Sequence, residues 1–285
     1  MQQRELGKTG IKLPVLGFGA MELRRMDESD AIHLLGRVLD MGCAFIDTSP
    51  DYAQSEEFIG KAISHRRNEF ILATKCACDI WSGKGGHIFT RAQFEKNLDN
   101  SLKLLRTEYI DVWQIHCPLP GDLESPQGDA IAYMFEQKKA GKIGAVGISF
   151  KNGSVGDPLY PAGYSKEGFE AYTDYGFDSI QSVYGALTCD CEEQIARAHS
   201  LGVGIIARGL LKRYTPEHEK RAAMLPDLGD ANELLIRYVI SNQNITSAIV
   251  GTSNAQHMKE NIAAAEKGTL PPDVIAEIKR RFNSI

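Results

Sequence analysis

The 285-residue sequence predicts a (β/α)8 barrel, and three observations support this fold class. Short apolar runs alternate with helical patterns along the chain, and eight such pairs follow one another from Phe18 onward. The runs are apolar throughout instead of alternating with polar residues, which is typical of parallel strands covered on both faces. Eight units of this kind in roughly 250 residues match the usual size of such a barrel.

The strands are placed by these apolar runs and by the glycines and polar residues that bound them. Ahead of them, Gly7-Lys8-Thr9-Gly10 separates two extended pieces and predicts an N-terminal hairpin within residues 4–16. The expected barrel strands lie near residues 16–21, 43–47, 70–75, 109–115, 143–148, 177–183, 203–208 and 246–250.

The helices are placed by apolar residues that recur at spacings of three and four. Residues 28–41 carry Ile32, Leu35, Val38 and Leu39 on one face, and Thr90 is a suitable N-cap for the helix that contains Phe94 and Leu98. The other expected helices lie near residues 55–63, 128–140, 165–174, 190–200 and 230–240, with extra C-terminal helices near 254–264 and 272–282.

A doubly wound sheet is the alternative fold, and the sequence disfavours it. Gly17-Phe18-Gly19 lacks the third glycine of a dinucleotide fingerprint and the acidic residue about 20 positions further on. No linker, charge block or low-complexity segment interrupts the alternation of strands and helices. We therefore expect residues 1–285 to form a single barrel domain.

The composition of the chain argues against some classes of binding partner. The 32 basic and 37 acidic residues give a net charge of −5, with no basic block to attract nucleic acid. No apolar run approaches the roughly 20 residues that span a bilayer, and residues 1–5 precede no signal-peptide core. The expectation is a cytoplasmic protein with a small-molecule substrate, no nucleic-acid partner and no membrane partner, and its oligomeric state is left open.

The six cysteines predict reduced thiols. They are few for this length, so a disulfide framework is not expected. Two pairs have the spacing Cys-x-Cys, namely Cys76 with Cys78 and Cys189 with Cys191. A metal site needs three or four ligands at workable spacing, and these pairs do not supply them. We therefore expect no metal site.

Titratable side chains stand where expected strands end. The strand before Asp47 is followed by a proline-containing turn that carries Tyr52, and the next strands end in Lys75 and His116. Barrel active sites lie at the C-terminal ends of the strands, so these four side chains are expected to meet at one mouth. Three further strand ends contribute Ser149, Gln181 and Arg208.

Asp, Tyr, Lys and His in one place suit acid–base chemistry on a carbonyl. A phenol is a poor proton donor at neutral pH, but a neighbouring ammonium favours its ionised form. Asp47 would hold the ammonium of Lys75 in place beside Tyr52, while His116 could orient a carbonyl. A protonating phenol beside a polarised carbonyl, without a nucleophile or metal, matches hydride transfer from a nicotinamide cofactor.

The segments that carry these residues resemble the aldo-keto reductase family, and the resemblance runs nearly from end to end. The matching segments, in order, are Leu16–Met21, Phe45–Tyr52, Leu72–Lys75, Asp111–His116, Lys142–Ser149, Ile180–Gln181, Ile249–Asn254 and Glu260–Asn261. The resemblance implies an NAD(P)H-dependent oxidoreductase that reduces an aldehyde or ketone. It also implies that Tyr52 is the general acid, that Lys75 and Asp47 tune it, and that His116 positions the carbonyl.

The same resemblance implies a set of cofactor-binding residues. Ser149 and Gln181 would hold the nicotinamide carboxamide, with Gly19 and Met21 on its other side and Asp47 beneath. The loops 208–211 and 251–261 would hold the pyrophosphate and adenosine through Arg208, Gly209, Leu211, Gly251, Thr252, Ser253, His257, Glu260 and Asn261.

Three positions depart from the family pattern. Phe150 follows Ser149 where the family usually has Asn, and Arg208-Gly209-Leu210-Leu211 stands where many members have an aromatic residue followed by Ser-Pro-Leu. Gly251 and His257 stand where a 2′-phosphate pocket often has Lys or Arg, and histidine is a weaker phosphate partner than arginine. NADP(H) is the expected cofactor, and NAD(H) is the alternative.

The long loops are expected to form the substrate pocket, with Trp81 and His87 in its wall and with simple loop packing as the alternative for Trp81. Strand alternation, if it continues, turns Cys117 away from His116, so Cys117 is assigned no role. Two other functions stay open. One is a dinucleotide-binding sensor or regulatory barrel with little turnover, and the other is a lyase that forms a Schiff base on Lys75.

Overall fold

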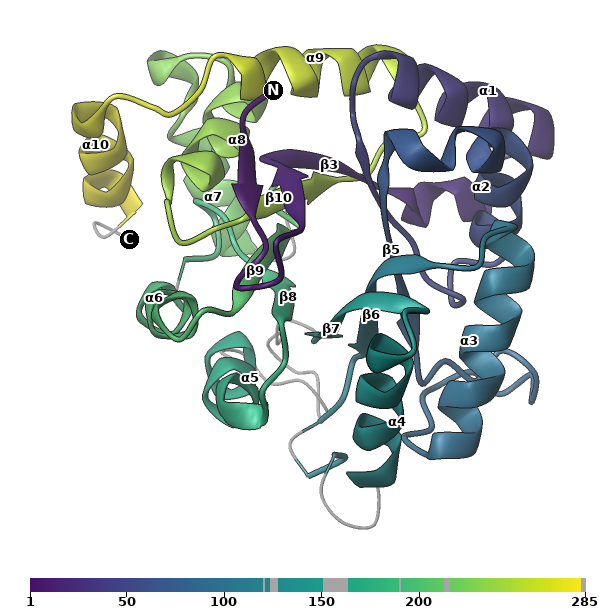
Figure 1. Ribbon diagram of the computed structural model, residues 1–285. Coiled ribbons are helices and arrows are strands. Elements are labelled where there is room, and N and C mark those ends of the chain that lie inside the picture. Colours follow the sequence, from purple (N-terminus) through teal and green to yellow (C-terminus); the bar gives the residue numbers. More distant parts are fainter. Residues whose placement is uncertain (120, 124–127, 151–163, 190, 213–215, 283–285) are drawn as a thin grey trace.

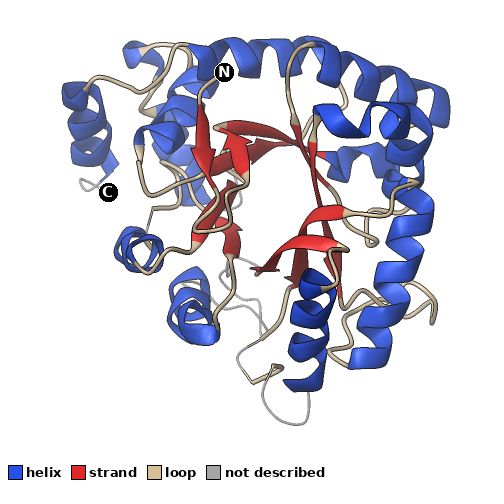
Figure 2. Cartoon of the chain, viewed as in Figure 1, coloured by secondary structure: helices blue, strands red, loops and turns tan. Residues whose placement is uncertain are grey.

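The computed structural model describes residues 1–119, 121–123, 128–150, 164–189, 191–212 and 216–282. Within these ranges, eight parallel strands close into a barrel and helices surround it (Figures 1 and 2). The strand order is β10-β3-β4-β5-β6-β7-β8-β9, so neighbours in sequence pair and the last strand closes onto the first. This order confirms the predicted barrel.

The barrel strands are short and each lies within or near an expected run. Their bounds are β3 Leu16–Gly19, β4 Phe45–Asp47, β5 Ile71–Cys76, β6 Ile110–His116, β7 Ile143–Ser149, β8 Ser179–Val183, β9 Gly204–Arg208 and β10 Ser247–Val250. Register is parallel throughout, as in the pairing of Asp47 with Ala73 and of Ser149 with Gln181.

The helices follow the strands along the chain. Their bounds are α1 Glu28–Asp40, α2 Ser55–Ile63, α3 Arg91–Leu105, α4 Gly128–Lys139, α5 Tyr164–Tyr172, α6 Glu192–Ser200, α7 Pro216–Ala223, α8 Ala231–Ser241, α9 Ala255–Glu266 and α10 Pro272–Phe282. Thr90 caps α3 as expected, because its hydroxyl accepts a hydrogen bond from the backbone N–H of Gln93. Within the described chain, no helix combines the length and the apolar character needed to cross a bilayer.

One helix was not expected. α7 lies between the expected strand near residues 203–208 and the expected helix near 230–240, where no element was predicted. Its sequence, Pro-Glu-His-Glu-Lys-Arg-Ala-Ala, buries only Ala222, so it has no apolar stripe for a helical pattern to reveal.

The N-terminal hairpin is confirmed, and it covers the barrel end opposite the strand C-termini. β1 (Gln3–Glu5) pairs antiparallel with β2 (Lys12–Pro14). Its turn has φ +57° at Gly7, where an added Cβ would lie 2.5 Å from the carbonyl oxygen of Gly202, just before β9. Glycine is therefore required at this position both for its backbone conformation and for space.

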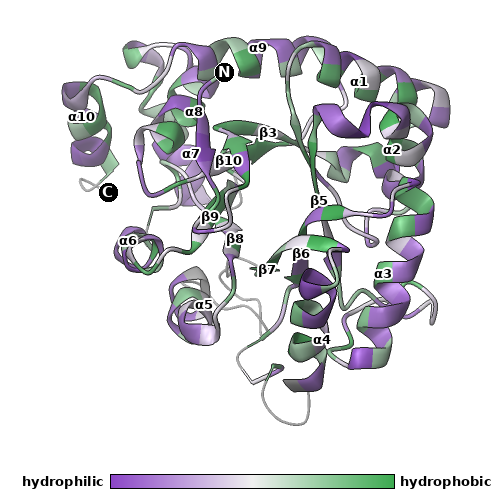
Figure 3. Cartoon of the chain, viewed as in Figure 1, coloured by the Kyte–Doolittle hydropathy of each residue, from purple (hydrophilic) through white to green (hydrophobic). Residues whose placement is uncertain are grey.

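Strand alternation divides the barrel strands into two faces. One face packs against the helices, and Figure 3 shows hydrophobic residues on the strands and on one side of most helices. The other face points into the barrel. There, a hydrophobic cluster separate from the helix layer fills the half that lies away from the C-terminal ends of the strands. This cluster consists of Leu6, Leu13, Phe45, Ala73, Val112, Ala145, Ile206 and Ile249.

Candidate active site

The polar groups of the site stand two residues beyond this apolar cluster on the same strands. Because side chains two apart share a face, Phe45 places Asp47 inside the barrel, and Ala73 does the same for Lys75. The same step leads from Val112, Ile206 and Ile249 to Gln114, Arg208 and Gly251, and two such steps lead from Ala145 to Ser149.

Lys75 and Asp47 form a buried ion pair. The ammonium donates to both carboxylate oxygens, at 2.9 and 2.8 Å, and to the backbone oxygen of Thr48 at 2.8 Å. Their side chains are 0% and 2% exposed. Burial alone would lower the pKa of Lys75, but the charge of Asp47, its hydrogen bond and the neighbouring Tyr52 together outweigh burial, so this pKa lies above its ordinary value. Lys75 is therefore a fixed positive charge.

Tyr52 stands next to this charge. Its backbone N–H donates to the carbonyl of Ser49 at 3.0 Å, which sets the turn after β4. The Lys75 ammonium lies 5.7 Å from the centre of the phenol ring. The ring of His116 meets the same phenol edge-on, with centroids 6.3 Å apart. The structure thus brings together the four side chains expected at one mouth.

His116 ends β6 and is almost buried. Its Nδ1 lies 3.0 Å from a carboxylate oxygen of Asp51. Burial opposes a charge on this imidazole, but Cys117 and Asp51 favour it, and together they raise the pKa of His116 well above its ordinary value.

The expectation for Cys117 was wrong. Residue 117 has φ +51°, so the alternation of the strand stops at His116 and does not turn the next side chain away. Burial alone would raise the pKa of Cys117, but the charge of His116 and a hydrogen bond with it lower that pKa to about 6. The thiol therefore interacts with His116, contrary to the sequence interpretation.

His87, expected in the pocket wall, contacts the site directly. Its Nε2 lies 3.0 Å from Asp51 and 3.3 Å from Nδ1 of His116. Residues 78 and 87 form an antiparallel bridge, so the loop after β5 folds back and returns His87 to the barrel mouth. Asp51 and Cys78 lie in the same cluster as these two histidines, and neither was predicted to belong to the site.

Trp81 lies further out on the same loop. Its side chain is 39% exposed, and the Lys96 ammonium on α3 lies 3.7 Å from its ring centre. This contact fits the loop-packing alternative, and a role in the substrate wall stays a prediction. Most of the loop between residues 150 and 164 lies outside the described residues.

Ser149 and Gln181 meet across neighbouring strands. The Ser149 hydroxyl donates to Gln181 Oε1 at 2.9 Å, and Gln181 Nε2 donates to Asp47 at 2.8 Å. Phe150 turns outward instead and packs against Phe169 on α5. Its carbonyl oxygen accepts a hydrogen bond from Arg208 at 2.8 Å, so two of the departing positions are linked to each other.

A cavity opens beside Tyr52 between the ends of β3, β9 and β10. It is lined by Gly19, Met21, Glu22, Asp47, Tyr52, Arg208, Gly209, Lys212, Ile249 and Gly251. Lys212 was not among the candidate residues. It follows β9 by four positions, between the expected strand near residues 203–208 and the next expected helix, and its cationic side chain close to a strand end is the signal that marks it.

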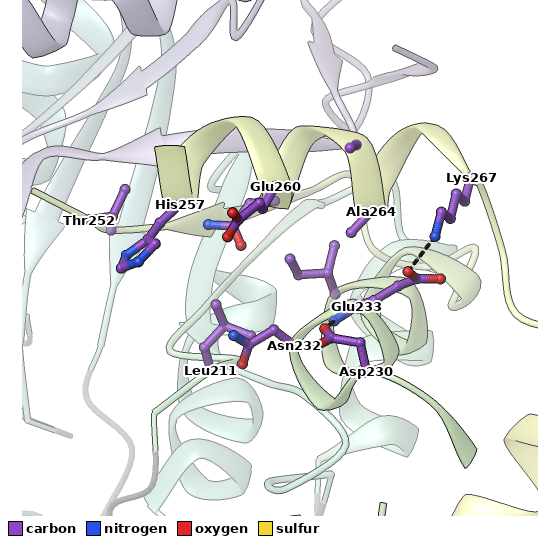
Figure 4. A pocket seen from close by; sticks show the side chains of 13 residues that line it. Leu211, Asp230, Asn232, Glu233, Thr252, His257, Glu260, Ala264 and Lys267 are labelled. Atoms are coloured by element: carbon purple, nitrogen blue, oxygen red, sulfur yellow. Dashed lines mark hydrogen bonds and ion pairs between the residues drawn. The ribbon is translucent and has the colours of Figure 1, made fainter. Parts of the chain in front are cut away.

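A second cavity, of about 450 Å³, continues from Gly251 between α8 and α9 (Figure 4). The candidate residues Leu211, Thr252, His257, Glu260 and Asn261 line it, together with Asn232 and Lys267, which were not expected. Ser253 is not part of it, since it lines a separate hollow with Met26 and His33 beside α1.

A buried carboxyl group behind the site gives a testable pH dependence. Glu56 on α2 accepts a hydrogen bond from Thr74 at 2.6 Å, and burial raises its pKa to about 7. The pKa of Glu56 is higher in the folded state than in the unfolded state. Glu56 therefore makes its full contribution to the free energy of unfolding below the unfolded-state pKa. This contribution is lost as pH rises through 7.

Glu56→Gln is therefore expected to gain stability relative to the native chain as pH rises from about 5 to 8, by on the order of 2–4 kcal/mol. Urea unfolding across this range measures the difference. Glu57→Gln, on the exposed side of α2, is the matched control and should show no such trend. A pH-independent difference for Glu56→Gln would show that Glu56 does not titrate in this range.

Comparison with known proteins places the chain in a family. The model of the "Aldo/keto reductase family" matches residues 15–228 and 226–281. The chain is 30% identical to an L-galactose dehydrogenase of Arabidopsis thaliana, over 93% of this chain and 88% of that protein. It is 23% identical to an NADH-specific methylglyoxal reductase of Escherichia coli, over 93% of both chains.

Among solved structures, the holo form of an aldo-keto reductase from Bacillus halodurans superposes with a TM-score of 0.84. It is 27% identical, over 98% of this chain and 96% of that one. The closed barrel, the gathered strand-end residues and the match along almost the whole sequence lead to one conclusion. The chain is a member of the aldo/keto reductase family.

Proposed function

We propose that this protein is an NAD(P)H-dependent reductase that converts an aldehyde or ketone to an alcohol. The buried Lys75–Asp47 pair beside the phenol of Tyr52 is the observation that carries the proposal. An ammonium without access to water exerts a strong field on a neighbouring hydroxyl, and a buried ion pair is in general only weak evidence for a purely stabilising role.

The chain's own residues have three tasks in this reaction. Tyr52 donates its proton to the carbonyl oxygen, and the Lys75 charge stabilises the phenolate that remains. Asp47 keeps that charge in place. His116 donates a hydrogen bond that orients the carbonyl. The bound cofactor supplies the hydride that reaches the carbonyl carbon.

The groove formed by the two cavities suits a dinucleotide. Ser149 and Gln181 offer a hydroxyl and an amide for the nicotinamide carboxamide, and Gly19 and Met21 line the cavity where the ring would lie. Arg208 and Lys212 bring positive charge for the pyrophosphate. The second cavity, with Asn261 at its wall, would take the adenosine.

A coupled assay tests the proposal. Purified protein should oxidise NADPH or NADH in the presence of small reactive aldehydes, with methylglyoxal included in the panel because one relative is named for it. The reverse reaction with L-galactose follows from the name of another relative. Tight dinucleotide binding without turnover on a broad carbonyl panel would instead favour the sensor alternative.

Cofactor preference should respond to residue 257. His257→Arg is expected to tighten NADPH binding by about tenfold, because a bidentate guanidinium pairs with a phosphate more strongly than an imidazole does. Fluorescence titration measures both cofactors, and NADH affinity should change little. His199→Arg on α6, an exposed position away from the groove, is the charge-matched control. Equal gains for NADPH and NADH would place residue 257 away from the 2′-phosphate.

A further inference from the structure

Four side chains with metal-binding atoms converge beside the active site. Asp51, Cys78, His87 and His116 each offer one ligand atom, and all four atoms lie within 4.8 Å of one another. They come from the turn after β4, from the two bridged positions of the loop after β5, and from the end of β6. None of these three segments supplies more than two of the four side chains.

The spacing of these atoms matches a tetrahedral site. A zinc ion with bonds of about 2.0–2.1 Å to nitrogen and oxygen and about 2.3 Å to sulfur has ligand atoms roughly 3.3–3.6 Å apart. His116 Nδ1 lies 3.3 Å from His87 Nε2 and 3.5 Å from Cys78 Sγ. Asp51 lies 3.0 Å from each imidazole. These four separations need to change by only a few tenths of an ångström, and no two of the four ligand atoms lie more than 4.8 Å apart.

Hydrogen bonds alone satisfy this arrangement poorly. The Nδ1 atom of His116 has four polar neighbours, namely Ser49 Oγ at 3.4 Å, Cys78 Sγ at 3.5 Å, His87 Nε2 at 3.3 Å and Asp51 Oδ2 at 3.0 Å. This nitrogen carries at most one hydrogen. If both imidazoles donate to Asp51, their N–H groups also face each other. A cation between the four atoms would instead accept a lone pair from each.

The loop that carries the thiol is held in place. The side-chain amides of Gln93 and Asn97 on α3 donate to the carbonyl oxygen of Cys78, at 2.5 and 3.0 Å. Cys78 is fully buried, whereas the side chains of Asp51 and His87 are 27% and 19% exposed. An ion could therefore enter from the side of Asp51 and His87 and meet a thiol that is already positioned.

We propose that Asp51, Cys78, His87 and His116 bind one Zn²⁺ ion. A thiolate, two imidazoles and a carboxylate are the ligand types of zinc and are unsuited to Mg²⁺ or Ca²⁺. The two anionic ligands balance the charge of the ion. Four protein ligands close a tetrahedral shell, so the ion has no open position for a substrate.

The position of the site gives it a regulatory consequence, which rests on the proposed function. His116 is both a zinc ligand here and the residue proposed to orient the carbonyl. Zinc on Nδ1 leaves only Nε2 of His116 to carry a hydrogen, so the ion would fix the tautomer of the side chain that orients the carbonyl. Reductase activity should therefore change when zinc is loaded, and a chelator should reverse the change.

Metal titration of the whole 285-residue chain tests the site without cofactor or substrate. After chelator treatment, the protein should take up one Zn²⁺ per chain in competition with a chromophoric chelator. Co²⁺ should give the intense visible bands of a tetrahedral complex and a thiolate-to-cobalt charge-transfer band. Absence of stoichiometric uptake, or a Co²⁺ spectrum without the thiolate band, would overturn the proposal.

Variants assign the ligands. Cys78→Ser and His87→Gln are each expected to weaken Zn²⁺ binding by at least about 100-fold, since even outer-shell changes cost about 10–100-fold. Cys189→Ser and His33→Gln change the same residue types elsewhere and should bind as the native chain does. Circular dichroism checks that each variant is folded. Equal losses in the control pair, or no loss in the site pair, would contradict the assignment. Because binding is read directly, the result stands whether or not the protein reduces carbonyls.

Discussion

Tyr52→Phe should lower kcat for aldehyde reduction by about 10²–10⁴-fold, the usual contribution of a positioned proton donor. The substitution removes only a hydroxyl, and the aromatic ring next to Lys75 is kept. Water can still protonate the carbonyl oxygen, but without orientation and without the field of the buried ammonium. Steady-state assays with the preferred cofactor and a reactive aldehyde measure the loss.

Two controls separate this effect from damage to the fold or the groove. Dinucleotide affinity of Tyr52→Phe should stay within about threefold of the native value, because the hydroxyl is not expected to contribute much to cofactor binding. Tyr175→Phe removes a hydroxyl from a phenol that is 37% exposed and stacked on Phe177, and it should remain fully active. Full activity in Tyr52→Phe would mean that another group donates the proton.

Lys75→Met has the second large expected effect, and it acts on activity and stability together. Removing one partner of a buried ion pair leaves the other charge uncompensated and typically costs about 3–5 kcal/mol. Here the remaining charge is Asp47, which is 2% exposed. Urea unfolding should show a lower midpoint, and carbonyl reduction should fall with it because Tyr52 loses its neighbouring cation.

A second substitution separates the two losses. Asp47→Asn in the Lys75→Met background removes the unpaired charge, and the new amide oxygen can still accept from Gln181. Stability of the double variant should recover by more than half, while activity stays as low as in Lys75→Met. If Lys75→Met alone unfolds at the same urea concentration as the native chain, the pair does not have the buried character described above.

The fold could be predicted because its signals are local. Each barrel strand is a short apolar run, and each run ends in a glycine, a polar residue or a charge, so the strand ends identified Asp47, Lys75 and His116 directly. Parallel strands then bring these ends to one side by geometry alone. α7 was missed for the converse reason, since its mostly polar sequence carries no such signal.

The parts of the site that were missed depend on backbone turns and on long-range packing. The positive φ of Cys117 reverses the direction that strand alternation predicts, and nothing in the residue type announces it. Cys78 was considered only as half of a Cys-x-Cys pair. Its neighbours in space are Asp51, His87 and His116, which lie 9 to 38 positions away along the chain. Sequence patterns do not reveal such a cluster, because its members meet only when the loop that follows β5 folds back.

The N-terminal hairpin, at the barrel end opposite the strand C-termini, also determines when the protein can finish folding. Arg4 donates hydrogen bonds to the carbonyl oxygens of Ile240, Asn242 and Ile245. The hairpin therefore acquires these partners only after more than 200 further residues have been made. Until then, Leu6 and Leu13 have no closed barrel to fill. Sealing of this end is thus a late event in biosynthesis, whatever the order in which the β/α units form.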